Sequence, residues 1–343
     1  MSFDKVCIHQ FGYELPPNKV SSEELEARLA PVYERLKLPQ GRLELMSGIK
    51  YRRFWDPGTR PSDGATAAGR KALAASGLDP HAIDCLIFCG VCRDLMEPAT
   101  ASFVHQGLGL GEKCLLFDIS NACLGFLDGM LLLANMIESG QVESGLIVSG
   151  ETAEDLVEST IAALLTDTTL TRKSIKSSFA SLTIGSGAVA LVMTSALKAD
   201  TGHYLRYAAW RANTSYNNLC QGGSRAATTL MATDSAELMK RGVETAHAAW
   251  LDFVAVSNWQ GSDIGRFFCH QVGRVHAALL FETLDLDPAR NFETLSDLGN
   301  VGSVSAPITM AIGIEQDTLL SGQRAAVLGI GSGINCLMLG IDW

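Results

Sequence analysis

The sequence predicts an α/β fold built from two similar halves, and three observations lead to that prediction. Short apolar runs alternate with helical patterns along most of the 343 residues, which is typical of sheets covered by helices on both faces. The composition is 47% hydrophobic and 19% charged, with 33 glycines, as in compact globular proteins. Part of the pattern also recurs about half a chain length later. A chain of this length can form two cores.

The internal repeat is short but consistent in its spacing. Ser-Gly-Gln occurs at 139–141 and again at 321–323, each time before an apolar run, and the offset is 182 residues. Phe-Cys at 88–89 and 268–269 matches upstream at an offset of 180 residues. A repeat this long predicts two α/β units packed as a pseudodimer, which we divide as 1–195 and 196–343.

The individual elements follow from caps, periodicity and apolar runs. Ser21 and Glu24 form a capping box that opens a helix to about Leu36, and the alanine-rich stretch 63–75 is helical in pattern. Residues 151–181, rich in Thr and Ser, read as a helical insertion in the first half. The expected strands are 83–90, 114–119, 144–149, 182–194, 265–270, 325–330 and 334–341, and the remaining helices are 99–108, 123–138, 234–256, 273–284 and 303–317.

Charge and cysteine content exclude several function classes. A formal net charge of −10 argues against a nucleic-acid partner. The longest apolar stretch, 124–137, contains Asp128 and is too short for a transmembrane segment, and no signal peptide is expected. Nine cysteines, an odd number, predict reduced thiols in the cytoplasm. Three of them, at 85, 89 and 92, lie in an apolar run without zinc-site spacing, so no metal is expected.

One cysteine, Cys123, lies where chemistry is favoured. The run 114–119 predicts a buried strand, Ser120 and Asn121 are good N-cap residues, and 124–138 predicts a helix. Cys123 at such an elbow would face unpaired N–H groups and a helix dipole, which lower a thiol pKa and favour the nucleophilic thiolate. The alternative is a buried, inert cysteine.

Three further polar groups lie at strand or helix ends. His270 follows the strand 265–270, and Asn300 precedes a helix rich in small residues. The tight turn Gly331-Ser332-Gly333 has N–H groups that could bind an oxyanion. Taken singly, these residues could also be a satisfied core histidine, a plain helix cap and an ordinary hairpin.

Together these residues carry a family resemblance. Asn121-Ala122-Cys123, His270-Gln271 and Gly299-Asn300 resemble the Cys-His-Asn site of the thiolase-superfamily condensing enzymes, with the ketoacyl synthase III-like group as the nearest branch. The turn at 331–333 is similar to that group's glycine-rich oxyanion turn. The resemblance covers essentially the whole chain. It implies a five-layered α-β-α-β-α thiolase fold from two duplicated halves, a homodimer, and no cofactor.

Glu97 indicates which condensation is catalysed. Joining two unactivated acyl thioesters requires removal of a C–H proton by a positioned base, whereas malonyl-using synthases obtain their carbanion by decarboxylation. The loop Arg93-Asp94-x-x-Glu97-Pro98 resembles the enzymes of bacterial long-chain olefin biosynthesis that perform head-to-head Claisen condensation. In that branch the glutamate acts across the dimer interface in the partner's site. The alternative for Glu97 is a solvated loop acid.

The resemblance therefore implies a role for each residue. Cys123 forms an acyl-enzyme from a fatty acyl-CoA, the N–H groups of Cys123 and Ser332 form the oxyanion hole, and His270 and Asn300 stabilise the enolate of a second acyl-CoA that Glu97 deprotonates. The product is a 2-alkyl-3-oxoalkanoic acid, and this condensation is the first step of long-chain olefin biosynthesis. Enzymes that act later in that pathway are expected as partners. Substrate tails are expected in channels lined by Leu124, Phe126 and the segment 151–181.

Two alternatives remain open from the sequence. One is a malonyl-ACP-dependent 3-oxoacyl-ACP synthase III, and the other is an acyl-thioester hydrolase in which water resolves the acyl-cysteine. A non-catalytic lipid-binding protein is disfavoured because Cys123, His270 and Asn300 occur together. Val275 lies near a position where carrier-protein synthases often place a basic residue, which favours CoA over carrier protein as the donor.

Overall fold

The computed structural model describes residues 1–225 and 228–343. The strands are β1 (Val6–Glu14), β2 (Asn18–Ser21), β3 (Tyr51–Phe54), β4 (Cys85–Cys89), β5 (Leu115–Ile119), β6 (Ser144–Glu151), β7 (Gly187–Ser195), β8 (Tyr204–Ala212), β9 (Cys220–Arg225), β10 (Thr228–Thr233), β11 (Arg266–Cys269), β12 (Arg324–Gly331) and β13 (Asn335–Asp342). The α-helices are α1 (Ser22–Arg28), α2 (Ala30–Leu36), α3 (Arg42–Ser47), α4 (Pro61–Ser76), α5 (Thr100–Leu108), α6 (Gly125–Glu138), α7 (Glu154–Thr166), α8 (Lys176–Phe179), α9 (Ser235–Ser257), α10 (Arg274–Thr283), α11 (Leu295–Leu298) and α12 (Ser305–Glu315).

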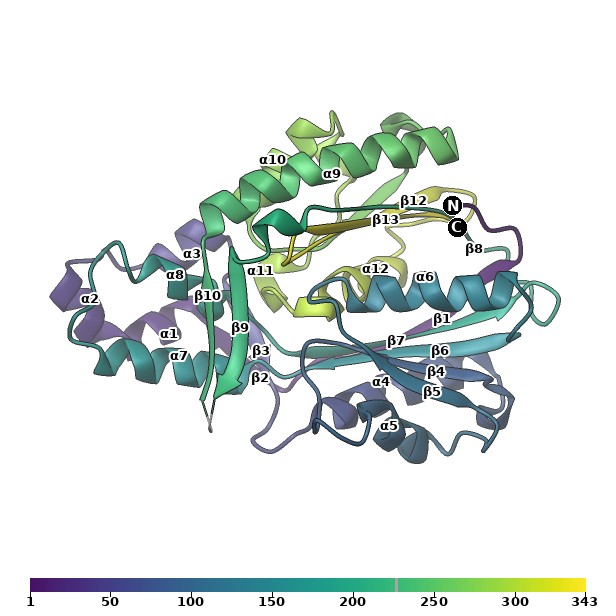
Figure 1. Ribbon diagram of the computed structural model, residues 1–343, viewed down its shortest axis with the longest axis horizontal. Helices are drawn as coiled ribbons and strands as arrows, with labels where there is room; N and C mark the ends of the chain where they lie inside the picture. The colour runs from purple at the N-terminus through teal and green to yellow at the C-terminus, as the bar shows by residue number, and fades with distance from the viewer. Residues whose placement is uncertain (226–227) are drawn as a thin grey trace.

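Five layers are visible in Figure 1, as the thiolase-like prediction requires. Nine strands are hydrogen-bonded in the order β11-β12-β13-β8-β1-β7-β6-β4-β5. The ladder between β1 and β8 consists of one residue pair, Cys7 with Tyr204, so the sheet divides there into two stacked halves. Helices α6 and α12 lie between the halves, α9 and α10 cover one outer face, and α4 and α5 cover the other (Figure 1).

Each boundary between layers is filled by a cluster of apolar side chains. The central cluster surrounds α6 and α12 and includes Phe126, Leu133 and Ile308, while separate clusters lie under α4 and α5 and under α9 and α10. Close packing requires a small residue at Gly129, where a Cβ atom would lie 2.6 Å from the sulfur of Cys89. The buried strands thereby hold their carboxyl ends in fixed positions, which matters for the site below.

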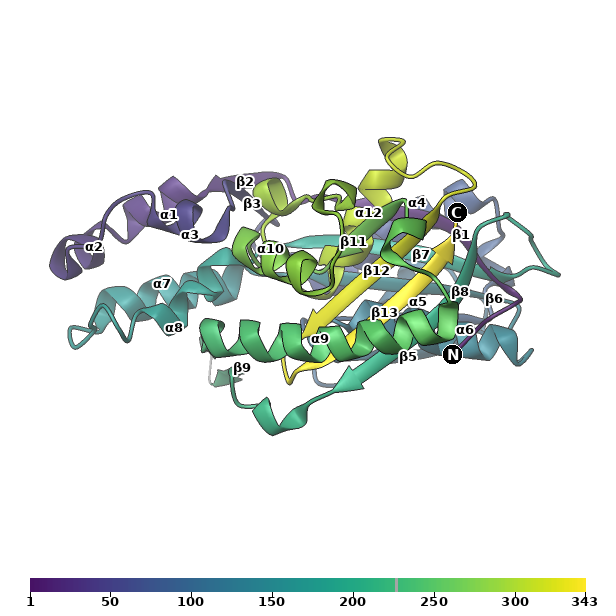
Figure 2. The same ribbon diagram turned by 90° about the horizontal axis from the view of Figure 1, so that it is seen from above.

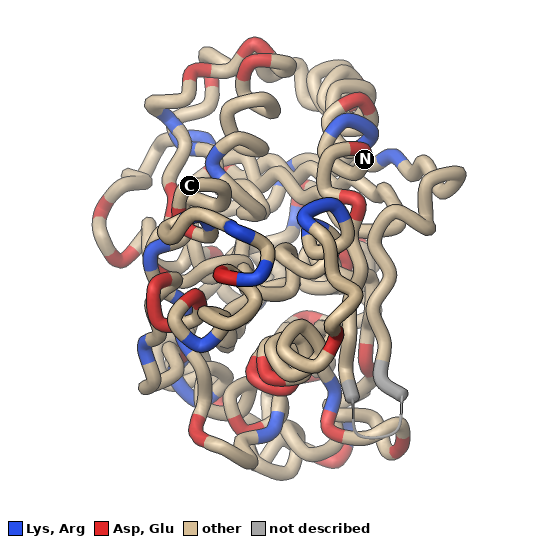
Figure 3. Tube along the Cα trace, turned by 90° about the vertical axis from the view of Figure 1, so that its left-hand side faces the viewer, with Lys and Arg blue, Asp and Glu red and all other residues tan. Residues whose placement is uncertain are grey.

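An arm of helices projects from one end of the layered body (Figures 1 and 2). It contains α1, α2, α3, α7 and α8 and has its own apolar core, which includes Leu25, Val32, Val157 and Ile161. The predicted insertion at 151–181 supplies α7 and α8, and the β9–β10 hairpin packs beside α7. Figure 3 shows acidic and basic residues interspersed over this end of the molecule.

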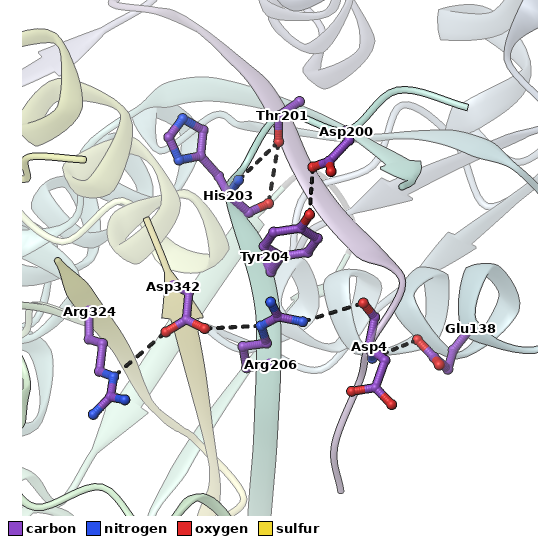
Figure 4. Close-up of polar contacts among 9 residues, drawn as sticks. All are labelled: Asp4, Glu138, Asp200, Thr201, His203, Tyr204, Arg206, Arg324 and Asp342. Carbon is purple, nitrogen blue, oxygen red and sulfur yellow. Dashed lines mark hydrogen bonds and ion pairs between the residues drawn. The ribbon is translucent and has the colours of Figure 1, made fainter. Parts of the chain in front are cut away.

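The polar network in Figure 4 lies at the opposite end of the body and ties the two chain termini together. Arg206 donates through Nε to Asp342 (3.0 Å) and through Nη1 to the carbonyl of Asp4 (3.3 Å). The backbone N–H of Asp4 in turn donates to Glu138 at the last turn of α6 (3.0 Å). Because a helix rises about 1.5 Å per residue, this network is remote from the first turn of α6.

Most predicted elements agree with the structure to within a few residues, and the differences have physical reasons. The capping box is confirmed, since Ser21 Oγ accepts the N–H of Glu24 at 3.0 Å and the Glu24 carboxylate accepts the N–H of Ser21. The single helix expected to about Leu36 is instead two, α1 and α2, divided at Leu29. Pro31 enters the first turn of α2, where its missing N–H is tolerated.

Other elements were not expected from the sequence. Strands β8, β9 and β10 contain many polar or small residues and lack a clear apolar run.

Among the described residues, no helix is both long and apolar enough to cross a membrane. We keep the boundary between halves near residue 195 as a proposal, because β7 ends at Ser195 and β1 and β8 meet through one residue pair.

Candidate active site

The elbow that carries Cys123 connects β5 to α6 through a strained turn. Ala122 has φ +47°, a left-handed conformation that is costly for a residue with a Cβ atom. The expectation that Ser120 or Asn121 caps the helix is wrong, because α6 begins at Gly125 with Leu124 as its uncapped N-cap. Asn121 instead donates through Nδ2 to Asp128 at 2.7 Å, one turn into the helix. This bond ties the elbow to α6 and holds Cys123 at the helix start.

The electrostatic setting of Cys123 differs from the sequence-based expectation. Burial raises the pKa of the Cys123 thiol to about 12, and negative charge on Glu151 and Cys220 acts in the same direction. The N–H groups of Cys123 and Ser332 point toward the sulfur and lower the pKa, but they do not outweigh the loss of solvent. The expected lowered pKa is therefore wrong. With a raised pKa the Cys123 thiol is protonated at neutral pH, and a thiol in that state requires a proton acceptor before it can act as a nucleophile.

The turn at 331–333 packs against the elbow that carries Cys123. Strands β12 and β13 pair up to Gly331 and Asn335 and are joined by a tight turn in which Gly333 (φ +81°) and Ile334 (φ +55°) are left-handed. A Cβ atom on Gly331 would lie 3.0 Å from Leu124, so the turn approaches the start of α6 as closely as glycine allows. This approach aims the N–H of Ser332 at the Cys123 sulfur.

His270 enters the site from the strand beside β12. Strands β11 and β12 are parallel, with Cys269 opposite Leu328, so His270 and the 331–333 turn leave the sheet at the same edge. The N–H of His270 donates to the carbonyl of Leu328 at 2.9 Å. Burial, with a smaller contribution from His276, lowers the pKa of His270 to about 3. The imidazole is therefore neutral at physiological pH, and its buried Nδ1 finds no hydrogen-bond partner among the described residues.

Asn300 is held by its backbone on both sides. Its N–H donates to the carbonyl of Thr183 (3.0 Å), and its carbonyl accepts from the N–H of Gly185 (2.8 Å). The side-chain Oδ1 accepts the N–H of Gly302 at 3.0 Å, which fixes the orientation of the amide. Because Oδ1 is used in this way, the Nδ2 group is left as the donor that a substrate carbonyl could use.

Glu97 differs from these four groups in its exposure to solvent. It is exposed, on a protruding loop between β4 and α5, and its peptide bond to Pro98 is cis. The neighbouring Met96 is 96% exposed. The base of the loop is ordered: the Asp94 carboxylate accepts from the N–H (2.9 Å) and hydroxyl (2.5 Å) of Ser62. A single chain therefore presents Glu97 outward from a firmly held base.

Leu124 and Phe126, the two residues expected to line substrate channels, pack in the central core. Leu124 is 1% exposed and Phe126 is fully buried, and Leu124 lies against the glycines of β12. A hollow of about 380 Å³ lies elsewhere, between α7, α8 and the β9–β10 hairpin. Its lining consists of Thr160, Ala163, Ser178, Gln221, Leu230, Met231 and Ala232. The insertion thus borders an open space, whereas Leu124 and Phe126 support the elbow.

The sequence assigns no role to Glu151 and Cys220, two groups near Cys123, although both lie in segments, Gly150-Glu151-Thr152-Ala153 and 210–220, that resemble the olefin-biosynthesis branch of the condensing enzymes. Glu151, at the end of β6, is 4% exposed and close enough to influence the charge on Cys123. Cys220, at the start of β9, is also within electrostatic reach of that thiol and accepts a hydrogen bond from Thr233 (3.4 Å). Beside that resemblance, Glu151 is the last residue of a buried strand, and an acid at the carboxyl end of a strand, next to other strand ends, is itself a signal for a site residue.

The arrangement can support acyl transfer. A thiol, an N–H pair aimed at it, a neutral imidazole and an oriented amide are the groups needed to form and stabilise an acyl-enzyme and an enolate. Within the part of the chain that the structure describes, no three His, Cys, Asp or Glu side chains gather so as to hold a metal ion.

Comparison with known proteins gives a consistent result. The model of the family described as 3-oxoacyl-[acyl-carrier-protein] synthase III matches residues 117–213, and the model of its C-terminal part matches residues 254–343. An acyl-CoA:acyl-CoA alkyltransferase from Shewanella oneidensis is 41% identical, and one from Xanthomonas campestris is 36% identical, each with full coverage of both chains.

Solved structures agree with these relatives. Cerulenin-bound OleA from Xanthomonas campestris superposes with a TM-score of 0.96 at 35% identity, covering 100% of this chain and 98% of that one. Other structures of that protein, with similar scores, carry a replaced cysteine, a replaced glutamate or a replaced histidine.

Proposed function

The chain belongs to the acyl-CoA:acyl-CoA alkyltransferase family, and we propose that its site joins two long-chain fatty acyl-CoA molecules head to head without decarboxylation. The product is a 2-alkyl-3-oxoalkanoic acid, the first intermediate of long-chain olefin biosynthesis. The observation that carries this proposal is the combination of a complete thiol, imidazole and amide set with a carboxylate on an outward loop. A malonyl-dependent synthase has no use for that carboxylate, since decarboxylation supplies its carbanion.

The same combination supports a homodimer in which Glu97 serves the neighbouring site. Strand β5 is the last strand of the sheet, and its Leu115 is 52% exposed. A free sheet edge is normally covered in the assembled protein, and so are exposed apolar side chains such as Leu95 and Met96 of the Glu97 loop. The Glu97 loop lies beside this edge, so a second copy placed on it would receive the loop. The two sites of such a pair are then each built from both chains.

The reaction begins with acylation of Cys123. The sulfur attacks the thioester carbonyl of the first acyl-CoA, and the thiol proton leaves with the CoA thiolate. We assign the transient acceptance of that proton to neutral His270, because its low pKa keeps a ring nitrogen free of a second proton. The N–H groups of Cys123 and Ser332 stabilise the tetrahedral oxyanion. The result is an acyl-cysteine.

Carbon–carbon bond formation follows with the second acyl-CoA. Its thioester carbonyl accepts hydrogen bonds from His270 and from Nδ2 of Asn300, and the partner subunit's Glu97 removes the α-proton. The resulting carbanion attacks the acyl-cysteine carbonyl, and the Cys123 sulfur leaves. Hydrolysis of the remaining CoA thioester releases the β-keto acid. The hollow beside α7 and α8 is an accessible place for part of an alkyl tail.

The test supplies the purified protein with a long-chain acyl-CoA as the only substrate and identifies products by mass. A β-keto acid, or the ketone formed when it decarboxylates, is the expected result. Free fatty acid alone would indicate a hydrolase, and activity only with malonyl-ACP and release of carbon dioxide would indicate a 3-oxoacyl-ACP synthase.

The base assignment has its own test. Glu97→Ala should reduce condensation by about 10² to 10⁴, the usual contribution of a general base, while acylation of Cys123 continues and is visible as a mass adduct. Arg93→Ala, on the same exposed loop, is the matched control and should retain condensation. Normal product formation by Glu97→Ala would show that another group takes the proton.

A further inference from the structure

The buried carboxylate of Glu151 joins two segments that lead to different parts of the site. Oε1 accepts the N–H of Val91 (3.0 Å) and Oε2 accepts the N–H of Cys92 (3.1 Å), at the start of the Glu97 loop. Oε1 also accepts the hydroxyl of Ser303 (2.7 Å) and, more weakly, its N–H (3.3 Å). A buried carboxylate satisfied by N–H and O–H donors holds those donors firmly, because bonds to a charged acceptor are the strong ones.

The contact with Ser303 leads directly to Asn300. Gly302 lies between them with φ +57°, and a Cβ atom there would lie 3.1 Å from Oε1 of Glu151. The N–H of Gly302 is also the donor that orients the Asn300 amide. The position of Glu151 therefore sets how closely the turn can fold against β6, and through Gly302 it sets the direction of the Asn300 side chain.

The other carboxylates that hold the Glu97 loop do not reach this turn. Asp94 binds Ser62 at the start of α4, and Asp118 on β5 accepts the N–H groups of Thr100 and Ala101 (2.8 Å each) at the start of α5. Glu151 is thus the carboxylate that holds both the inner end of the loop and the Asn300 turn.

We propose that Glu151 is a positioning residue which sets, within one protomer, the Asn300 amide of its own site and the Glu97 loop that serves the neighbouring site. The proposal rests on the proposed function, in which Glu97 acts across the dimer. It follows that one buried side chain links the geometry of the two sites. Damage to its loop-side bonds acts on the neighbouring site, and damage to its turn-side bonds acts on its own.

Glu151→Gln separates these two effects. A glutamine has one acceptor oxygen in place of two, so in either orientation of the amide one N–H of the loop, that of Val91 or of Cys92, faces an NH₂ group. The orientation that places the oxygen beside Ser303 retains the turn-side bonds. Ser303→Ala is the complementary variant, since it removes the short turn-side bond and leaves both loop-side bonds.

The experiment uses heterodimers purified through two different affinity tags, one chain carrying Cys123→Ala and the other Glu97→Ala. Such a dimer has one complete site, with the thiol from the Glu97→Ala chain and the base from the Cys123→Ala chain. Glu151→Gln is added to one chain or the other, and condensation of a long-chain acyl-CoA is measured. We expect a loss of about tenfold or more when it lies on the base-donating chain, and a loss of about threefold or less on the thiol-donating chain.

Ser303→Ala should give the opposite pattern, with the larger loss on the thiol-donating chain. Equal losses on both chains, or no loss, for Glu151→Gln would overturn the proposal. An inactive parental heterodimer would instead show that Glu97 does not act across the interface, and both proposals would fall. Thermal unfolding of each heterodimer identifies any general loss of folding.

A second readout distinguishes positioning of the site from a structural role alone. Because the negative charge of Glu151 helps to raise the pKa of Cys123, Glu151→Gln should shift the pH profile of Cys123 alkylation by iodoacetamide toward lower pH. Asp94→Ala, which weakens the loop and removes a carboxylate that is not among the groups acting on the Cys123 thiol, should leave that profile unchanged. An unshifted profile for Glu151→Gln would remove Glu151 from the surroundings of the thiol and contradict the proposal.

Discussion

The interior of the site, formed by Cys123, His270, Asn300 and Ser332, and the Glu97 loop differ in how the structure holds them. Cys123, His270, Asn300 and Ser332 follow buried elements and are oriented by backbone hydrogen bonds, strained turns and glycine contacts within one chain. Glu97 lies on an exposed loop whose base is fixed by Asp94 and Glu151. Under the proposed function, this difference divides the chemistry between chains. Acylation would use groups of one chain, whereas proton abstraction from the second substrate would use a loop received from a neighbouring chain.

Cys123→Ala, compared with Glu97→Ala, should separate the two regions by the largest effect on activity. Loss of the nucleophile should abolish both acylation and condensation, by at least about a thousandfold, whereas loss of Glu97 should spare acylation. Mass spectrometry of the protein after incubation with acyl-CoA measures the adduct, and product analysis measures condensation. Cys220→Ala removes a second partly exposed thiol near the site and should still acylate. Acylation that persists in Cys123→Ala would place the nucleophile elsewhere.

Asn300→Ala should lower the rate of condensation while leaving acylation of Cys123 largely unchanged. Its Nδ2 group is assigned to the enolate oxygen, and removal of one such donor costs about 10² to 10³ in rate. Acyl-enzyme formation, which uses the N–H groups of Cys123 and Ser332, should change by less than about tenfold. Single-turnover acylation and steady-state condensation should therefore diverge. An equal loss in both steps would mean that Asn300 supports the nucleophile and not the second substrate.

The sequence predicts those features of the site that depend on neighbouring residues in the chain, and it fails for those that depend on distant residues. The positions of Cys123, His270 and Asn300 at element ends are visible in short apolar runs and turn residues, and the five-layered fold follows from the family resemblance. The sequence predicts the pKa of Cys123 in the wrong direction, because the burial that raises it comes from packing, and Glu151 and Cys220 come from distant parts of the sequence.

The positions of Leu124 and Glu151 differ from what local sequence indicates for the same reason. Periodicity at the start of α6 cannot distinguish a core residue from a channel residue, so the packing of Leu124 against β12 appears only in three dimensions. Glu151 resembles a solvated acid at the end of a strand until its four donors, from two separate loops, are known.

The pH dependence of thiol reactivity tests whether the interior is as desolvated as its packing indicates. With the pKa of Cys123 near 12, the thiolate fraction rises about tenfold per pH unit between pH 7 and 9. Alkylation by iodoacetamide should therefore increase about a hundredfold over that range without a plateau. Because the pKa of His270 is about 3, no histidine inflection should appear between pH 5 and 8. A plateau near pH 7 would indicate a stabilised thiolate and would reverse the assignment.

The smallest effect is expected where the loop is weakened and the interior is left intact. Asp94→Ala removes the carboxylate that accepts both the N–H and the hydroxyl of Ser62, so the base of the Glu97 loop loses one of its anchors. Condensation should fall by about tenfold, the equivalent of one charged hydrogen bond, and acylation should not change. Asp94→Asn should recover most of the loss, because an asparagine can accept the N–H of Ser62 and donate to its hydroxyl. Failure of asparagine to rescue would mean that the charge facing Arg60, 3.8 Å away, is what the loop requires. A parallel loss of acylation would show that the loop also supports the groups that acylate Cys123, so the two regions would not act independently.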